Sequence, residues 1–109
     1  MTRALFICSA NKLRSPTAEH VFSQWPGLEV DSAGLNNDAD TPLSPEQIEW
    51  ADVIFVMERD HLTRLRRNFT RHAAGKRVIC LNIADDYGYL QPELIELLEA
   101  RVGPFLRQA

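Results

Sequence analysis

The sequence has 109 residues, 45% of them hydrophobic and 25% charged, with a formal net charge of −3. This length predicts one domain, residues 1–109, and the acidic balance gives no reason to expect nucleic acid as a partner of the whole surface. No apolar run approaches the roughly 18 residues that span a bilayer, the start lacks a secretory leader, and two cysteines do not make a disulfide framework, so we expect a cytoplasmic protein with no membrane partner.

The first third of the chain predicts a strand, a helix and a second strand. Residues 4–8 are continuously apolar, as in a parallel strand that is covered on both faces. From Ser15, the expected N-cap, apolar residues recur at helical spacing until residues 26–27 (Pro-Gly) stop the helix. Residues 28–34 alternate between apolar and polar, which predicts a half-exposed strand at a sheet edge.

The rest of the chain continues this alternation. In order, we expect a loop at 35–45, a short helix from 44 to 50, a strand at 52–57, a helix from 58 to 69, a strand at 77–83, a loop at 84–92 and a helix from Pro92 that residues 103–104 end or kink. With right-handed crossovers, this order predicts a three-layer, doubly wound α/β fold. Its four parallel strands should follow the order 2-1-3-4, with helices on both faces. Ligands of such sheets bind beyond the carboxyl ends of the strands, where Cys8 would lie.

The stretch ICSANKLRSPTAE (7–19) places Cys8 and Arg14 between a strand and a helix. The five residues between them, Ser9 to Leu13, can curl so that their amides point into one concavity, and such a nest binds anions. The helix N-terminus and the Arg14 guanidinium add donors suited to a phosphate, and the same positive field favours the thiolate of Cys8. This pattern predicts phosphoryl chemistry, although Cys8 alone could be an ordinary buried cysteine.

The stretch resembles the phosphate-binding loop of low-molecular-weight protein tyrosine phosphatases. Three later stretches are also similar to that family: DSAG (31–34), ADVIFVMERDHLTRL (51–65) and ADDY (84–87). The resemblance implies a phosphomonoester hydrolase that acts on a phosphorylated protein or a small phosphomonoester. It also implies that no metal or other cofactor is required.

Carried over to this chain, the resemblance assigns roles to particular residues. Cys8 would be the nucleophile, Arg14 the phosphate clamp and Asp85 the general acid that protonates the leaving oxygen. The residues that would bind phosphate are Ser9, Ala10, Asn11, Lys12, Leu13, Arg14 and Ser15. Supporting roles would fall to Asn11, Ser15, Ser32, Asp86 and Tyr87, with Tyr87 lining the mouth and Asp86 remaining a possible acid. The three histidines show no metal-ligand spacing, and we expect ordinary surface or partly buried roles for them.

Several positions depart from the family pattern. Ala10 stands where glycine is usual, Leu13 replaces a second cysteine, and Lys12 adds positive charge at the entrance. The segment between residues 34 and 51 is shorter than in the family and lacks its aromatic cleft wall; Trp50, the only aromatic there, is expected in the core. Phosphate chemistry is thus better supported than tyrosine specificity.

Two other functions remain open at this stage. A thiol-based arsenate reductase shares this type of loop but needs further cysteines, and only Cys80 is available, in a strand that we expect to be buried. A non-catalytic module could bind phosphorylated or nucleic-acid ligands. Residues 59–77 hold seven Lys/Arg and one acid, against five basic and fourteen acidic residues elsewhere, which could make a docking surface for an anionic partner.

Overall fold

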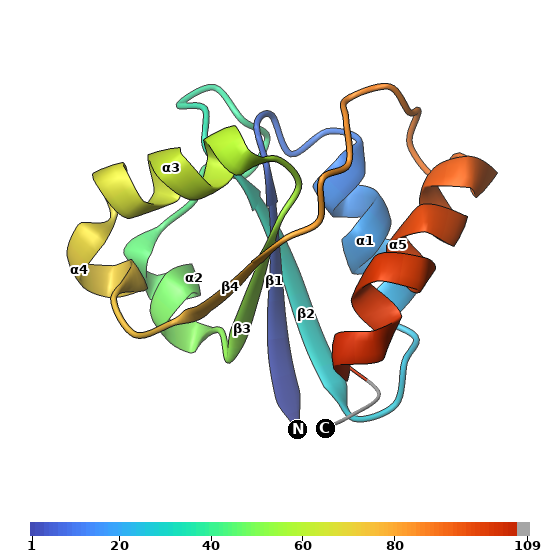
Figure 1. Cartoon of the computed structure of the whole chain (residues 1–109), viewed down its shortest axis with the longest axis horizontal. Helices are drawn as coiled ribbons and strands as arrows, with labels where there is room; N and C mark the ends of the chain where they lie inside the picture. Colours follow the sequence, from blue (N-terminus) through green and yellow to red (C-terminus); the bar gives the residue numbers. More distant parts are fainter. Residues whose placement is uncertain (107–109) are drawn as a thin grey trace.

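The computed structural model describes residues 1–106, which form a four-stranded parallel sheet between two helical layers (Figure 1). The strands are β1 (Thr2–Cys8), β2 (Leu28–Gly34), β3 (Val53–Val56) and β4 (Arg77–Cys80), in the order β2-β1-β3-β4. Both the α/β class and the predicted strand order are confirmed. The helices are α1 (Arg14–Phe22), α2 (Pro45–Trp50), α3 (Arg59–Asn68), α4 (Thr70–Ala73) and α5 (Pro92–Leu106). None of them is long and apolar enough to cross a membrane.

Side chains of β1 alternate between two separate cores, one on each face of the sheet. Phe6 and Cys8 belong to the cluster covered by α1 and α5, where the Phe6 ring stacks between Phe22 and Phe55 at centroid distances of 5.5 and 5.3 Å. Leu5 belongs to the cluster covered by α2, α3 and α4 (Figure 1). Because β1 is central and buried on both faces, it holds its last residue, Cys8, rigidly at the carboxyl edge.

Several element boundaries differ from the sequence prediction, and helix α4 was not predicted. Helix α1 begins at Arg14, so Ser15 is not its N-cap; the Ser15 hydroxyl contacts the Cys8 thiol instead. Strand β4 ends at Cys80 rather than at residue 83, and Cys80 is only half-buried because β4 is an edge strand. Helix α5 continues through Pro104 to Leu106.

The short helix α2 follows the sequence signal closely. Ser44 accepts a hydrogen bond from the Gln47 amide, and the Gln47 side chain accepts one from the Ser44 amide, which makes a capping box. Pro45 occupies the first helical position, where its missing N–H costs nothing. Trp50, at the end of this helix, packs against the second core as expected.

Candidate active site

The Cys8–Arg14 loop is held from outside by residues 35–40, which we call the bracing loop. The amides of Leu35, Asn36 and Asp40 donate to the carbonyls of Cys8, Ser9 and Ala10 over 3.0, 3.0 and 3.1 Å. Because these carbonyls point toward the bracing loop, the amides of the Cys8–Arg14 loop can point to the other side, where a ligand would bind. The segment after β2 therefore supports the backbone of the Cys8–Arg14 loop.

Gly34, at the end of β2, allows the two loops to approach. A Cβ atom at this position would lie 2.7 Å from the Ser9 carbonyl oxygen and 2.6 Å from the Ala39 Cβ. Both distances are shorter than any real contact, so only glycine fits here. The final residue of DSAG is thus required by packing against the Cys8–Arg14 loop.

Backbone conformation explains two residues of the loop. Asn11 has a positive φ of 55°, a conformation that asparagine tolerates better than most residues, as the sequence predicts. Ala10, where the resemblance led us to expect glycine, is not among the non-glycine residues with positive φ. Alanine therefore fits this position without backbone strain.

The Cys8 thiol lies at the bottom of the loop with only 3% of the residue exposed. Its Sγ is 3.0 Å from the Ser15 Oγ and accepts a hydrogen bond from the Asn11 amide at 3.3 Å. Donors of this kind stabilise a thiolate as a nucleophile and also as a leaving group.

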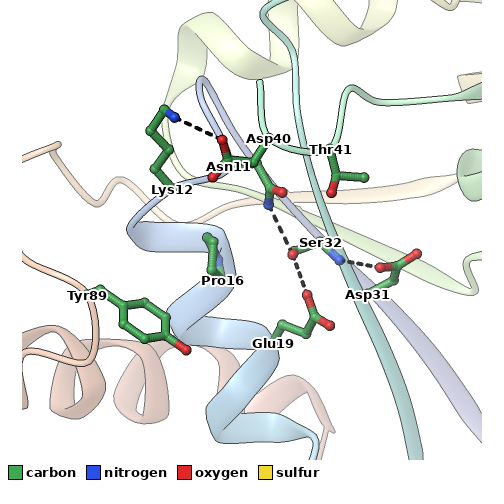
Figure 2. A pocket seen from close by; sticks show the side chains of 9 residues that line it. All are labelled: Asn11, Lys12, Pro16, Glu19, Asp31, Ser32, Asp40, Thr41 and Tyr89. Carbon is green, nitrogen blue, oxygen red and sulfur yellow. Dashed lines mark hydrogen bonds and ion pairs between the residues drawn. The ribbon is translucent and has the colours of Figure 1, made fainter. Parts of the chain in front are cut away.

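A directed chain of hydrogen bonds lies behind the thiol. The Asn11 Nδ2 donates its two protons to the hydroxyls of Ser15 (2.8 Å) and Ser32 (3.0 Å). The Ser32 hydroxyl in turn donates to the Glu19 carboxylate, and Figure 2 shows the part of this chain from Asn11 to Glu19. Because Ser15 accepts from Asn11, its own proton is free to point to the thiol, its nearest remaining partner. The expected supporting residues Asn11, Ser15 and Ser32 therefore meet, and Glu19 is an addition that the sequence interpretation missed.

Arg14 is buried, and the surrounding protein fixes one side of its guanidinium. Its Nη1 donates to the Glu58 carboxylate over 2.6 Å and to the Ile83 carbonyl over 2.7 Å. The hydrogen bond from Arg14 lowers the pKa of Glu58 below its usual value. Since these contacts use Nη1, the edge formed by Nε and Nη2 can receive two oxygens of a tetrahedral anion.

Of the two adjacent acids, the structure brings Asp85 to the pocket. An Oδ1 atom of Asp85 lies 3.6 Å from the Arg14 Nε, and Asp85 lines the same cavity as Cys8. Asp86 is exposed and is not a lining residue of this cavity. Tyr87 packs its side chain against the core under α1 and α5 and is not among the lining residues of this cavity.

Two anchors hold the segment that carries these acids. At its start, the Ile83 carbonyl accepts from Arg14, and near its end the Leu90 amide donates to the Thr17 hydroxyl at 3.0 Å. Both partners belong to α1, immediately after the Cys8–Arg14 loop. This attachment restrains the segment that carries Asp85 and Asp86.

His61 is fully buried against the Cys8–Arg14 loop, not an ordinary surface residue. Its Nδ1 accepts from the Glu58 amide at 3.0 Å, so the proton lies on Nε2, which donates to the Ser9 hydroxyl at 2.9 Å. Helix α3 is thereby tied to the residue that follows the nucleophile. In the sequence, the one available sign of this role is that Glu58 and His61 follow the carboxyl end of a buried strand, where ligands of such sheets bind.

The pKa of His61 leads to a prediction about stability. Burial, reinforced by the positive charge of Arg14, lowers the pKa of His61 to about 4, from an unfolded value near 6.5. Its stabilising contribution is therefore complete above pH 6.5 and is lost as the pH falls toward 4, because only the unfolded chain then binds the proton. We expect urea titrations to show the free energy of unfolding falling by up to about 3 kcal/mol across this window.

A His61→Gln variant, which keeps a donor near Ser9, should lose most of this pH dependence. The matched control is His20→Gln, which removes an exposed histidine. An unaltered pH slope in His61→Gln would show that other groups cause the dependence.

A cavity of about 150 Å³ lies over the thiol and is lined by Cys8, Ala10, Lys12, Leu13, Arg14 and Asp85. It brings together most of the residues that we expected to contact phosphate. Lys12 also forms a 2.8 Å ion pair with Asp40, which raises the pKa of Lys12 and offsets part of the charge expected at the entrance. No group of three or more potential metal ligands occurs within residues 1–106.

Comparison with known proteins finds a sequence family that this part of the chain is similar to. The sequence model of the low molecular weight phosphotyrosine protein phosphatases matches residues 3–51, which include β1, the Cys8–Arg14 loop, α1 and β2. No curated protein sequence matches the chain.

Solved structures match over nearly the whole chain. A low molecular weight protein tyrosine phosphatase from T. tengcongensis has a TM-score of 0.80 at 20% identity, covering 100% of both chains. The YwlE arginine phosphatase from Geobacillus stearothermophilus scores 0.78 at 24% identity, covering 99% of this chain and 94% of its own. The tyrosine phosphatase Wzb from Escherichia coli K30, in complex with phosphate, scores 0.76 at 23% identity, covering 97% and 96%. At these identities the structural likeness establishes the fold.

Fold, loop and family match together define a cysteine-dependent phosphatase. Residues 3–51 match the sequence model of the low molecular weight phosphotyrosine protein phosphatase family, and the described chain shares its fold with a solved low molecular weight protein tyrosine phosphatase. The resemblance drawn from the sequence is thereby confirmed.

Proposed function

We propose that the protein hydrolyses phosphotyrosine in proteins through a phosphocysteine formed on Cys8. The observation that carries this proposal is the placement of a recessed thiol, a half-engaged guanidinium and an acid around one small cavity. The family match supports phosphatase chemistry, and the substrate and the roles of individual residues are our inference.

In the first step, the Cys8 thiolate attacks phosphorus and the bond to the tyrosine oxygen breaks. The carboxyl group of Asp85 donates its proton to that oxygen, which leaves as a phenol. Loop amides and the Nε–Nη2 edge of Arg14 hold the equatorial oxygens, whose negative charge must be balanced in the transition state.

In the second step, water attacks the phosphocysteine. The Asp85 carboxylate takes a proton from this water, the phosphorus–sulfur bond breaks, and phosphate and the thiolate are released. The Ser15 hydroxyl, 3.0 Å from the Sγ, stabilises the departing thiolate. A structure of a YwlE mutant contains a phosphorylated active-site serine, so this fold accommodates a phosphorylated side chain at its active site.

The shape and charge of the entrance favour phosphotyrosine over two other phosphorylated residues. Because Cys8 is recessed, a long substrate side chain reaches it more readily than a short phosphoserine. Leu13 is 38% exposed beside the cavity and can contact an aromatic ring. The cationic guanidinium of phosphoarginine would lie near Lys12 and Arg14, which disfavours it.

Two measurements test this proposal. Mixing stoichiometric protein with p-nitrophenyl phosphate at mildly acidic pH should release a burst of p-nitrophenol followed by turnover. With peptides of one sequence, kcat/KM should be highest for phosphotyrosine, compared with phosphoserine and phosphoarginine. Phosphate binding without any hydrolysis would favour a binding module. A higher kcat/KM for phosphoarginine would show that the substrate is phosphoarginine and not phosphotyrosine.

The arsenate-reductase alternative conflicts with the position of Cys80. Strand β3 separates β1 from β4, so the backbones of Cys8 and Cys80 lie at least roughly 9 Å apart. A disulfide requires Cα atoms within about 7 Å. The two thiols cannot form a redox pair without moving a strand. Since both cysteines are free thiols, we place the protein in a reducing compartment, the cytoplasm.

A further inference from the structure

Helices α3 and α4 carry exposed arginines that form no ion pair within residues 1–106. Arg64 lies within 3.9 Å of the Asp60 carboxylate and also donates to Asn36. Four exposed arginines, which we call the arginine face, lack such a carboxylate partner: Arg59, Arg66, Arg67 and Arg71. The basic segment seen in the sequence is therefore only partly neutralised by the fold.

Helix stability accounts for only part of the arginine face. Arg66 and Arg67 lie in the last turn of α3 and Arg71 in the last turn of α4, where positive charge is favourable, but Arg59 begins α3, where it is unfavourable. The apolar side of α3 is supplied by other residues, chiefly the buried Leu65. Neighbouring like charges repel one another, so an anionic partner would relieve a cost that the free protein bears.

The arginine face starts at the active site and leads away from it. Glu58, directly before α3, binds the Arg14 guanidinium, and α3 runs from that point toward α4 at the edge of the molecule (Figure 1). At 1.5 Å per residue, Arg66 lies about 10 Å along the helix axis from Arg59. About three residues of extended peptide cover that length.

Another side of the site has the opposite charge. A hollow next to the Cys8–Arg14 loop is lined by three carboxylates, Glu19, Asp31 and Asp40, and by one ammonium group, that of Lys12 (Figure 2). An acidic peptide would be repelled there and attracted along α3. A long polyanion such as nucleic acid would also meet the remaining acidic surface, so a short acidic segment fits better.

We propose that the arginine face binds acidic residues located a few positions from the phosphorylated residue of a protein substrate. This inference rests on the proposed function, because it assigns a sequence preference to the same active site. The preference is electrostatic and should weaken as salt is added.

The test compares two phosphotyrosine peptides, one with glutamates flanking the phosphotyrosine and one with glutamines. At low ionic strength we expect about tenfold higher kcat/KM for the glutamate peptide, a difference of about 1.4 kcal/mol. In the triple variant Arg59→Gln/Arg66→Gln/Arg67→Gln, the ratio of kcat/KM for the glutamate peptide to kcat/KM for the glutamine peptide should fall close to one. Turnover of p-nitrophenyl phosphate should be unchanged. None of these three residues lines the catalytic cavity.

A matched pair of single variants serves as the control. Arg59→Gln should reduce the ratio, whereas Arg3→Gln, which removes one exposed charge at the amino end of β1, should leave it unchanged. Equal kcat/KM for both peptides, or a ratio that survives the triple substitution, would overturn the proposal. Tighter binding of a single-stranded oligonucleotide than of the acidic peptide would overturn it in favour of nucleic acid. Failure of the wild type to hydrolyse p-nitrophenyl phosphate would instead contradict the proposed function.

Discussion

A Cys8→Ser variant is expected to lose turnover of p-nitrophenyl phosphate by at least about 10³-fold, while still binding inorganic phosphate. The reason is that a serine hydroxyl is not ionised at neutral pH, whereas the loop amides and Arg14, which hold the anion, are left in place. Steady-state kinetics measure the first effect, and calorimetric titration with phosphate measures the second.

The other cysteine of the chain provides the control for this experiment. Cys80→Ser should have wild-type activity, because Cys80 lies in the edge strand β4 and outside the catalytic cavity. Turnover by Cys8→Ser within tenfold of the wild type would show that another group attacks phosphorus. Loss of phosphate binding together with a lowered Tm would indicate a misfolded loop; a Cys8→Ala variant would then separate folding from chemistry.

An Asp85→Asn variant is expected to lower kcat toward phosphotyrosine by about 10²-fold or more, and Asp86→Asn by far less. Asp85 lines the cavity, and its Oδ1 lies 3.6 Å from the Arg14 Nε, whereas Asp86 is not a lining residue. General-acid catalysis matters most when the leaving oxygen is basic. The loss should therefore be larger for phosphotyrosine than for p-nitrophenyl phosphate.

Asp86→Asn is the matched control, since it makes the same change one residue away. Small and equal effects of both substitutions would remove the general-acid assignment from this pair. A larger loss in Asp86→Asn would move the assignment to Asp86. A loss in Asp85→Asn that does not depend on the leaving group would indicate a role in placing Arg14 instead.

Local sequence signals predicted the parts of the site that are local in the chain. The apolar run before Cys8, the spacing to Arg14 and the tolerance of Asn11 for positive φ all depend on neighbours within seven residues. The strand order followed from the alternation of apolar runs with helical patterns.

Two of the missed residues, Glu58 and His61, act over long separations in the chain. Glu58 is 44 residues from Arg14, and His61 is 52 residues from Ser9, so no periodicity links them. The inward packing of Tyr87 was not predicted, because the pattern of the 84–92 loop does not reveal which of its aromatic side chains turns inward. Tyr89, the more exposed of the two, lines the neighbouring hollow instead.

Because of the close fit at Gly34, a substitution that disturbs only packing at the end of β2 would lower the catalytic activity. Any side chain there would have to displace the Ser9 carbonyl or the Ala39 methyl group, and with them the backbone that positions the nucleophile. In a random mutagenesis screen scored by activity, Gly34 would therefore be grouped with the catalytic residues, although it has no reactive atom. Sensitivity to substitution in this protein thus extends from the reacting groups to the surfaces that set their spacing.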